Sequence, residues 1–454
     1  MNRFFSTAIF IAVAGVLSAD AWFFTRDKVL YQTIDDNTAT VTGCDASLVD
    51  VVIPATVDYD GRTYEVVSIA ARAFASSSIQ TLTAAESVVE VGRQAFFLAS
   101  SLREVYLPGL TTLGEGAFYL SGVGKVVFSD KLTVIPKDAF DSCKSKLEVD
   151  LSHVKTIGST AFRKCVMDNV EIGDGMTLEK GAFQECQISS MTITGTVNLP
   201  SGTFVFDRGK IGELTLVDVD FSSNGDAVNP TVEKLVILQK DRTVMNIGGV
   251  PSRSSAKSIY LDADTETLEP LHGTSVSPFS NSSGLQTVVM GPLVKLVYNN
   301  MFYKCPKLET VSMSASVTEV ENAAFADCNA IKTVECMASV PPVCSPGAFT
   351  STVYGGAVLK VPEGSRDAYA AADGWSLFSS VEGSLSGIGS VEASDDCIVR
   401  VAGGRILFDC PDGTHVAVYG VDGRLVYEGR PCAVAPGRGV YIVRVGRHAV
   451  RVAV

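Results

Sequence analysis

The dipeptide Ala-Phe recurs along this chain of 454 residues at nearly constant spacing. The first six phenylalanines of the series are separated by steps of 22, 22, 22, 22 and 21 residues. These copies are Ala73-Phe74, Ala95-Phe96, Ala117-Phe118, Ala139-Phe140, Ala161-Phe162 and Ala182-Phe183. A fixed period in the twenties is typical of solenoids, in which each unit is too small to bury its own apolar face and stacked units share one core. The spacing therefore predicts a solenoid whose phenylalanine rings stack on one another.

The pattern weakens after the sixth copy and then returns. Thr203-Phe204 is interpreted as a weakened copy, and clear copies reappear at Phe279, Phe302, Phe325 and Phe349. Short apolar segments in between keep about one repeat of spacing, at Leu214–Leu216, Leu235–Leu238 and Ser258–Leu261. We interpret this zone as continued coils with degenerate turns, because repeat arrays tolerate atypical units. A separate domain inserted over residues 205–278 is the alternative.

A single repeat indicates the secondary structure. Leu102, Val105 and Leu107 follow an L-x-x-L-x-L pattern, and a second short apolar segment runs from Leu110 to Phe118. Aliphatic and β-branched residues separated by Gly, Pro, Asn or Ser favour short strands and tight turns. We expect one parallel strand per coil, about 4.8 Å from the next. The predicted fold is mainly β: a leucine-rich-repeat solenoid with parallel strands and a period of about 22, plus a small C-terminal β-sandwich.

Five of the eleven cysteines occupy one column of the repeat. Each lies three residues after a repeat phenylalanine, at Cys143, Cys165, Cys186, Cys305 and Cys328. Other copies place Ser77, Ala99, Ser121 or Ser282 in that column. A position that accepts Cys, Ala or Ser needs a small side chain, and buried free cysteine behaves as a small hydrophobe. A local Cys336–Cys344 bridge and one pair among Cys397, Cys410 and Cys432 remain possible. The chain has no C-x-x-C motif that would indicate a metal site.

The N-terminus has the features of a secretory signal peptide over residues 1–21. An apolar run from Phe4 to Leu17 is followed by the small-x-small site Ala19-Asp20-Ala21. The apolar run is shorter than the roughly 20 residues that a membrane span needs. An uncleaved N-terminal anchor is the alternative. No transmembrane segment is expected after signal removal.

Atypical units are expected at both ends of the repeats, because a solenoid must cover its exposed core edges. Residues 22–68 are predicted to form the N-terminal cap, residues 69–360 the repeats, and residues 361–383 a C-terminal cap with a short helix and a Trp-Phe closure. Residues 384–396 are rich in small and polar side chains and are predicted to be a linker. Residues 397–454 alternate short apolar segments with Gly-containing turns, which predicts a β-sandwich.

The repeat unit resembles a known family. Ile157-Gly-Ser-Thr-Ala-Phe-Arg-Lys-Cys165 is similar to the unit of BspA-like leucine-rich repeats of bacterial surface proteins. Val361-Pro-Glu-Gly-Ser and Gly374-Trp375 resemble that family's last unit, and the resemblance spans roughly residues 28–383. It implies an exported protein at the cell surface or outside the cell, whose repeat surface adheres to host or matrix proteins or to other cells.

The C-terminal segment resembles the sorting domain of the type IX secretion system of Bacteroidetes. The similar residues are Val418-Tyr419, Asp422–Val426, Gly439–Arg444 and Val450–Val454. The resemblance implies a contact between residues 397–454 and secretion machinery. A terminal module with a purely structural role is the alternative, since a fold-level analogy does not fix function.

Several functional classes are disfavoured. The four histidines, His153, His272, His415 and His448, stand in no recognisable nucleophile context, and G-x-S-x-G is absent. Phosphate-binding glycine loops and regular Ca²⁺ loops are absent as well. The net charge of −13 and the pI near 4.9 oppose nucleic acid and anionic membrane as partners. We expect no enzyme activity and no cofactor, catalytic residue or metal site.

If aliphatic residues fill the inward strand positions, the alternate positions form an outer face. Those singled out as a candidate partner-binding face are Arg103, Glu104, Tyr106, Lys125, Glu148, Asp150, Glu171, Thr192, Glu309, Lys332 and Glu335. Acids outnumber bases among them, so the face is either a solvated surface or an acidic stripe for a basic partner. Tyr106 is the best single anchor, because Tyr is enriched at interface hot spots.

The partner expected from these residues is a protein or glycan on a host, a matrix or a neighbouring cell. A structural protein that organises its own envelope is the alternative class, and a secreted enzyme is a more distant one.

Overall fold

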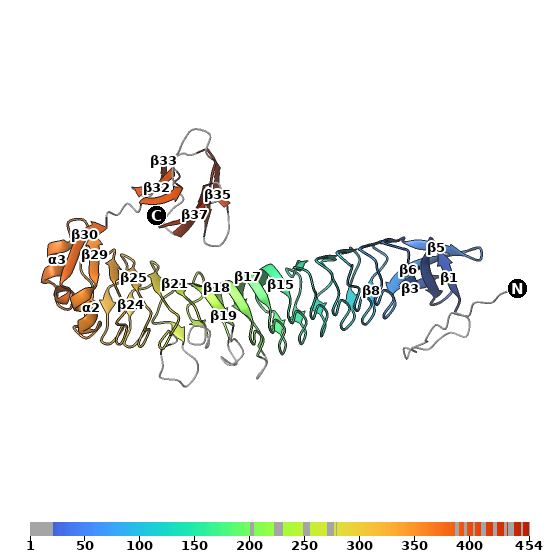
Figure 1. Ribbon diagram of the computed structural model, residues 1–454, viewed down its shortest axis with the longest axis horizontal. Coiled ribbons are helices and arrows are strands. Elements are labelled where there is room, and N and C mark those ends of the chain that lie inside the picture. Colours follow the sequence, from blue (N-terminus) through green and yellow to red (C-terminus); the bar gives the residue numbers. More distant parts are fainter. Residues whose placement is uncertain are drawn as a thin grey trace. The chain divides into compact units, whose positions relative to one another are not determined.

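The computed structural model describes most of the chain and divides it into two compact units, residues 1–166 and 167–454. The described residues are 21–199, 204–221, 230–247, 255–269, 277, 279–385, 390–394, 397–402, 405–409, 415–420, 425–430, 434, 440–445 and 448–453. The predicted signal peptide, apart from Ala21, lies outside them. Along the repeats, parallel strands form a β-solenoid of about 14 turns with a period of about 23 residues (Figure 1). The mainly β solenoid predicted from the sequence is confirmed.

The first unit begins with an antiparallel edge and continues as parallel coils. Strand β1 pairs antiparallel with β2, and β2 with β3, whereas β3 and β6 are parallel. Strands β4, β7, β9, β11 and β13 form one parallel sheet. The strands of this unit are β1 (Phe23–Arg26), β2 (Val29–Thr33), β3 (Thr38–Cys44), β4 (Asp50–Ile53), β5 (Thr56–Tyr59), β6 (Arg62–Ile69), β7 (Thr81–Ala84), β8 (Glu90–Val91), β9 (Glu104–Leu107), β10 (Thr112–Leu113), β11 (Lys125–Phe128), β12 (Val134–Ile135), β13 (Glu148–Val149) and β14 (Thr156–Ile157).

Stacked phenylalanines form the centre of the first unit. Phe74, Phe96, Phe118, Phe140 and Phe162 are fully buried. The ring centroids of successive members lie 5.4, 4.9, 5.0 and 5.2 Å apart, with interplanar angles of at most 6°. This near-parallel arrangement lets each ring contact the rings of both neighbouring coils. The predicted aromatic stack is confirmed here.

The backbone beside each ring takes an unusual conformation. Gln94 and Leu98, two residues before and after Phe96, have φ of 54° and 57°. The same left-handed pair recurs at Arg72 and Ser76, Gly116 and Leu120, Asp138 and Ser142, and Thr160 and Lys164. These residues turn the backbone so that the amides of Phe96 and Leu98 donate to the carbonyls of Ala117 and Tyr119 in the next coil. Hydrogen bonds therefore join neighbouring coils at the turns as well as along the strands.

The second unit contains a twelve-stranded sheet that runs through the zone of weakened repeats. Strands β18, β19, β21 and β23 pair parallel in succession, so the prediction of continued coils is confirmed and an inserted domain is excluded. Its elements up to residue 385 are β15 (Val166–Ile172), which begins at the boundary, β16 (Thr177–Leu178), β17 (Gln187–Thr196), β18 (Lys210–Asp220), β19 (Thr231–Leu238), β20 (Met245–Asn246), β21 (Ser258–Asp262), β22 (Leu268–Glu269), β23 (Thr287–Met290), β24 (Leu296–Val297), β25 (Thr310–Met313), β26 (Glu319–Val320), β27 (Thr333–Cys336), β28 (Val343–Cys344), α2 (Ser351–Gly356), β29 (Val358–Pro362), α3 (Arg366–Ala371), the 3-10 helix η1 (Trp375–Leu377) and β30 (Ser380–Leu385).

The weakened copy assigned to Phe204 is wrong. Phe204 is 48% exposed, whereas Phe206 is 1% exposed and its ring stacks on Phe183 at 5.6 Å and 13°. The interval from Phe183 to Phe206 is therefore 23 residues, and the inward position falls two residues later than the sequence pattern suggested. The sequence does not distinguish the two positions, because two phenylalanines stand close together and the preceding alanine is missing from both.

The second aromatic series ends against a cluster of large side chains. Phe279, Phe302, Phe325 and Phe349 stack at 5.3, 5.4 and 4.9 Å. Phe349 then meets Phe378 edge to face at 5.4 Å, and the buried Trp375 donates from its indole N–H to the carbonyl of Pro342 at 2.7 Å. The expected short helix is present as α3. Tyr354, Trp375 and Phe378 pack around the ring of Phe349.

The C-terminal segment forms two small antiparallel sheets. The sheets are made of β31 (Ser390–Ser394), β32 (Cys397–Ala402) and β33 (Arg405–Asp409), and of β34 (Val416–Gly420), β35 (Leu425–Gly429), β36 (Val440–Val445) and β37 (His448–Ala453). Val399 and Ile406 of the first sheet share an apolar core with Val418, Val443 and Val452 of the second. The predicted β-sandwich is thus confirmed.

The segment expected to be a linker, residues 384–396, differs from the prediction. It contains the end of β30 and the whole of β31, because Ser390–Ser394 pairs antiparallel with β32.

Among the described residues, no helix is both long and apolar enough to cross a membrane.

Candidate recognition surface

The candidate face divides between the two units. Six of its residues belong to the first unit and five to the second. In the first unit Glu104, Lys125 and Glu148 stand opposite one another on β9, β11 and β13. Lys125 Nζ lies 2.9 Å from Glu148 Oε1, and both side chains are exposed. Arg103, which precedes β9, is exposed as well. These residues form a mixed column of charges and not a purely acidic one.

A second outward column of the first unit is partly apolar. Val52, Thr83, Tyr106 and Val127 stand opposite one another on β4, β7, β9 and β11. Val52 is 69% exposed, Tyr106 is 46% exposed and Val127 is 36% exposed. Only Tyr106 had been identified from the sequence. The alternation of inward and outward positions could have located Val52 and Val127, since both follow a buried strand residue by one position.

Asp150 and His153 lie just beyond the end of β13. Together with Lys125 and Glu148 they line a cavity of about 140 Å³ in the first unit. The Asp150 carboxylate accepts a hydrogen bond from the amide of Ser152 at 2.9 Å. The hydrogen bonds from Ser152 lower the pKa of Asp150, and His153 adds a smaller effect in the same direction. The carboxylate is therefore ionised at neutral pH.

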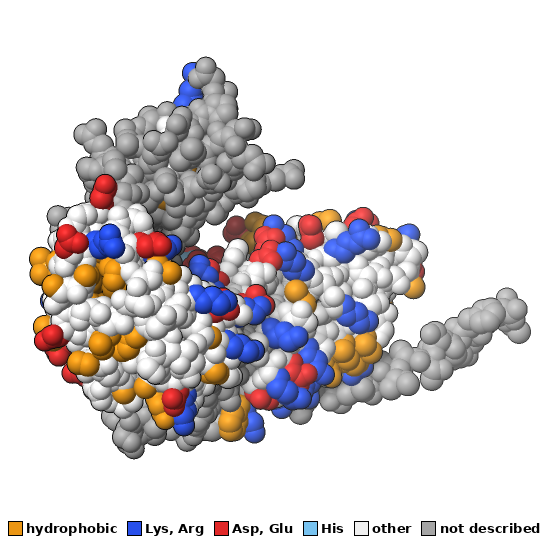
Figure 2. Space-filling view, turned by 60° about the vertical axis from the view of Figure 1, so that its left-hand side comes forward, with side chains coloured by type: hydrophobic (Ala, Val, Ile, Leu, Met, Phe, Trp, Pro, Cys, Tyr) orange, Lys and Arg blue, Asp and Glu red, His pale blue; other side chains and the backbone are white. Residues whose placement is uncertain are grey.

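The five candidates of the second unit are spread over β15, β17, β25, β27 and the segments beside them. Glu171 is exposed, Thr192 is half-buried, and Lys332 Nζ lies 3.0 Å from Glu309 Oε1. Glu335 Oε1 lies 4.0 Å from Nζ of Lys360. Acidic and basic side chains are interspersed over the surface in view (Figure 2). Ion pairs between neighbouring coils thus balance much of the acidic charge of this face, each contributing little to stability because it is solvated.

A polar cavity in the second unit was not predicted. It has a volume of about 380 Å³ and is lined by Asp220, Asp241, Arg242, Thr243, Val244 and Asn246. The Asp218 carboxylate stabilises the turn that begins at Lys240, because it accepts hydrogen bonds from the amides of Lys240 at 2.7 Å and Asp241 at 3.0 Å. Arg242 is paired with Asp220 at 3.4 Å.

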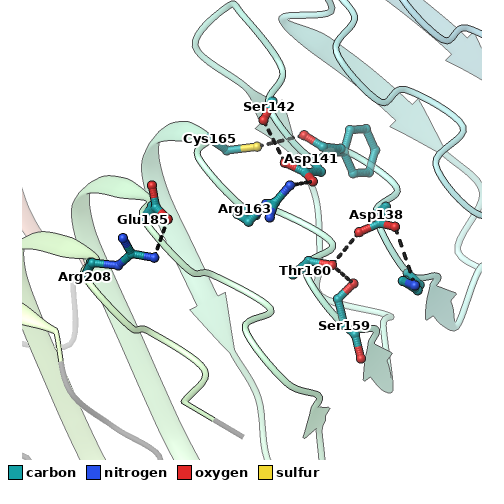
Figure 3. Close-up of polar contacts among 11 residues, drawn as sticks. Asp138, Asp141, Ser142, Ser159, Thr160, Arg163, Cys165, Glu185 and Arg208 are labelled. Carbon is teal, nitrogen blue, oxygen red and sulfur yellow. Dashed lines mark hydrogen bonds and ion pairs between the residues drawn. The ribbon is translucent and has the colours of Figure 1, made fainter.

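The turns carry ion pairs of their own (Figure 3). In the first unit the Asp141 carboxylate, whose side chain is 2% exposed, lies 2.6 Å from Nη2 of Arg163. Ser142 also donates to Asp141, at 2.8 Å. In the second unit Arg208 lies 2.8 Å from Glu185. Because each of these pairs joins residues about one repeat apart, we assign them to the stability of the coils.

The cysteine column is buried and holds free thiols, as predicted. Cys143, Cys165, Cys186, Cys305 and Cys328 are all buried and unbridged. The alternative bridge between Cys336 and Cys344 is not formed, and both thiols are free. Burial raises the pKa of Cys344 to about 12, so its thiol stays protonated and unreactive. Side chains of Cys397, Cys410 and Cys432 lie outside the described part of the chain.

Within the described ranges, no group of three or more His, Cys, Asp or Glu side chains could hold a metal ion.

Comparison with known proteins begins with the repeat. The sequence model described as "BspA type leucine rich repeat region" matches residues 67–189, 146–216 and 271–352, in six copies. Together these ranges cover about half of the chain. None of the curated proteins compared matches it.

Solved structures of similar proteins come from several bacteria. A leucine-rich cell surface protein from Faecalibacterium prausnitzii A2-165 is 18% identical, covers 70% of this chain and 96% of its own, and has a TM-score of 0.31. A leucine-rich repeat protein from Bacteroides ovatus ATCC 8483 is 19% identical, with coverages of 80% and 92% and a TM-score of 0.34. The pneumococcal vaccine antigen PcpA is 11% identical, with coverages of 80% and 99% and a TM-score of 0.29. Because the BspA-type repeat model matches about half of its residues, the chain belongs to the BspA-type leucine-rich repeat family.

Proposed function

We propose that this protein recognises a macromolecular partner without catalysis, through the outer face of its parallel sheet. The observation that supports this most directly is the column of Val52, Tyr106 and Val127, exposed on strands whose other faces are buried in the core. An aromatic ring between aliphatic side chains gives apolar contact area, and the neighbouring charges give orientation. Backbone hydrogen bonds between coils hold the strands of both columns in place, so little backbone conformational freedom is lost on binding.

The test is a binding screen of the exported protein against purified extracellular-matrix proteins, mucins and glycans. For any ligand found, the double variant Tyr106→Ala, Val127→Ser is expected to weaken binding at least about tenfold, because truncating a hot-spot residue costs about 2 kcal/mol or more. The control is Val343→Ser, which alters a valine of the second unit that is 69% exposed, against 36% for Val127. Equal binding by the double variant and the parent protein would place the recognition surface elsewhere. A screen without any ligand would favour the envelope-organising alternative.

We also propose that the protein is exported and displayed at the cell surface or released, with its C-terminal sandwich as a sorting signal. The family relation and the sequence resemblance of residues 397–454 support this. Because β31 pairs with β32, the test deletion should begin before Ser390 and remove both sheets whole. The truncated protein is expected to accumulate in the periplasm, as followed by surface proteolysis and fractionation. Normal surface display of the truncated protein would leave the sandwich with a structural role only.

A further inference from the structure

The cavity in the first unit arises from a mismatch in strand length. Strand β11 has four residues, whereas β13 has two and pairs only with Lys125 and Val126. After Val149 the chain turns away, and the bond from the Ser152 amide to Asp150 stabilises that turn. Consequently no residue of β13 stands beside Val127 or Phe128, and the space there is the cavity of about 140 Å³.

The cavity has an apolar floor and a charged rim. Its floor contains Val126, Leu132 and Val154, which are buried, together with the half-buried Phe128 and Val149. An apolar cavity of about 150 Å³ is large enough for a benzene molecule. The space therefore suits one long side chain of a partner and is too small for a folded segment.

The rim has excess negative charge. Asp130, Glu148 and Asp150 are exposed acids, and Lys125 is the one lysine or arginine among the lining residues. The Lys125 ammonium is already paired with Glu148 at 2.9 Å. Two carboxylates, those of Asp130 and Asp150, are thus left without a lysine or arginine partner among the described lining residues. An anionic ligand would be repelled, and a purely aliphatic one would desolvate these carboxylates without compensation.

We propose that this cavity receives an arginine side chain of a protein partner, an inference that rests on the proposed recognition function. The methylene stem of the arginine packs against Val126, Leu132 and Val154, as long cationic side chains do on apolar surfaces. The guanidinium reaches the rim, where its planar set of N–H donors matches carboxylate acceptors. Val127 lines the cavity and Tyr106 stands next to Val127 on the adjacent strand, so the same partner covers the apolar column.

The experiment uses the full chain and the probe peptide acetyl-Gly-Arg-Gly-amide, with saturation-transfer NMR as the readout. The control peptide has citrulline in place of arginine, which keeps the shape and removes the charge. We expect saturation of the arginine methylenes and a loss of most of that signal with citrulline. Binding should also weaken as salt is raised, because the rim is solvated.

The matched variants are Asp130→Asn with Asp150→Asn, and Glu115→Gln as the control. Asn keeps an oxygen able to accept the Ser152 bond, so the turn is preserved. Glu115 is exposed on the same unit and does not line the cavity. The double variant is expected to reduce peptide affinity about tenfold or more, and Glu115→Gln to leave it unchanged.

Equal binding of the two peptides, or equal affinity of the double variant and the parent, would overturn the arginine assignment. Absence of any saturation transfer at millimolar peptide would do the same. These outcomes are separable from the proposed function. A macromolecular ligand that still depends on Tyr106 while the peptide fails would keep the recognition surface and remove only this pocket.

Discussion

The thiol of Cys165 donates a hydrogen bond to the backbone carbonyl of Phe140, at 3.1 Å, in the preceding coil. Cys143 does the same to Phe118 at 3.4 Å, and Cys328 to Phe302 at 2.9 Å. The carbonyls of Phe140 and Phe118 also accept the amides of Cys143 and Ser121 in their own coils, so the thiol there occupies the second lone pair of the oxygen. The column therefore favours a side chain that is small and can donate.

Substitutions of Cys165 should show that the site needs a small side chain that can donate. Cys165→Ser keeps a donor and is expected to change the free energy of unfolding by no more than about 1 kcal/mol. Cys165→Val removes the donor and adds a branch in a fully packed site, so we expect a loss of about 2 kcal/mol. Urea unfolding of both variants tests this. Equal loss for Ser and Val would mean that the hydrogen bond is unimportant.

Stability should fall at alkaline pH because of Cys344. Its pKa is raised to about 12 by burial, and by the nearby Cys336 in second place, against about 8.5 for an exposed thiol. The unfolded chain therefore loses this proton first as the pH rises. The stabilisation is fully present below about pH 8.5 and is lost progressively between there and pH 12.

The measurement is the urea midpoint at pH 8 and pH 10 in the presence of reductant, for the parent and for Cys344→Ser. At pH 10 the parent should have lost about 2 kcal/mol more than the variant. Parallel pH profiles for the two proteins would contradict the assignment to Cys344.

The register of the aromatic series can be tested two residues apart. Phe206→Ala removes a buried ring stacked on Phe183 and should cost about 3–5 kcal/mol. Phe204→Ala changes an exposed ring and should cost no more than about 0.5 kcal/mol. Hydrogen exchange at β17 and β18 would detect the local loss if unfolding is not two-state, as is common in repeat arrays. A larger effect at Phe204 would restore the register expected from the sequence.

Loss of Arg163 should destabilise the first unit. Arg163→Met leaves the buried Asp141 carboxylate with Ser142 as its remaining side-chain donor. Because Arg163 is about one-third exposed, water screens the pair, and we expect a cost of about 2 kcal/mol. The double variant Arg163→Met, Asp141→Asn should recover part of that loss in thermal unfolding. Failure of the second substitution to recover any stability would show that packing of the Arg163 stem dominates.

The coils were predictable because one periodic signal decides them. An inward ring every 22 or so residues fixes the phase of each strand, and Val105 and Leu107 then fall inward while Glu104 and Tyr106 face out. Where two phenylalanines stand close together, as at Phe204 and Phe206, the sequence does not show which ring points inward.

The turns and the surface were less accessible to sequence analysis. Leu98 and Leu120 adopt positive φ, a conformation that glycine or asparagine at the same positions would have predicted. Backbone hydrogen bonds to the next coil compensate the conformational cost of these positive φ angles. Because the acceptors belong to another coil, the residues of the turn do not predict these bonds. Likewise, the cavity beside β11 depends on the length of β13 relative to its neighbour, a relation between two coils that the residues of either coil alone do not reveal.

The short strand β13 also bears on how such a protein diversifies. Each coil is hydrogen-bonded to its neighbours by the same backbone pattern. A strand that is two residues shorter therefore changes the surface of a single coil, and the aromatic stack beneath it stays continuous from Phe118 to Phe162. New binding specificity can therefore arise from a small change of strand length in any one coil, with the fold and the core unchanged.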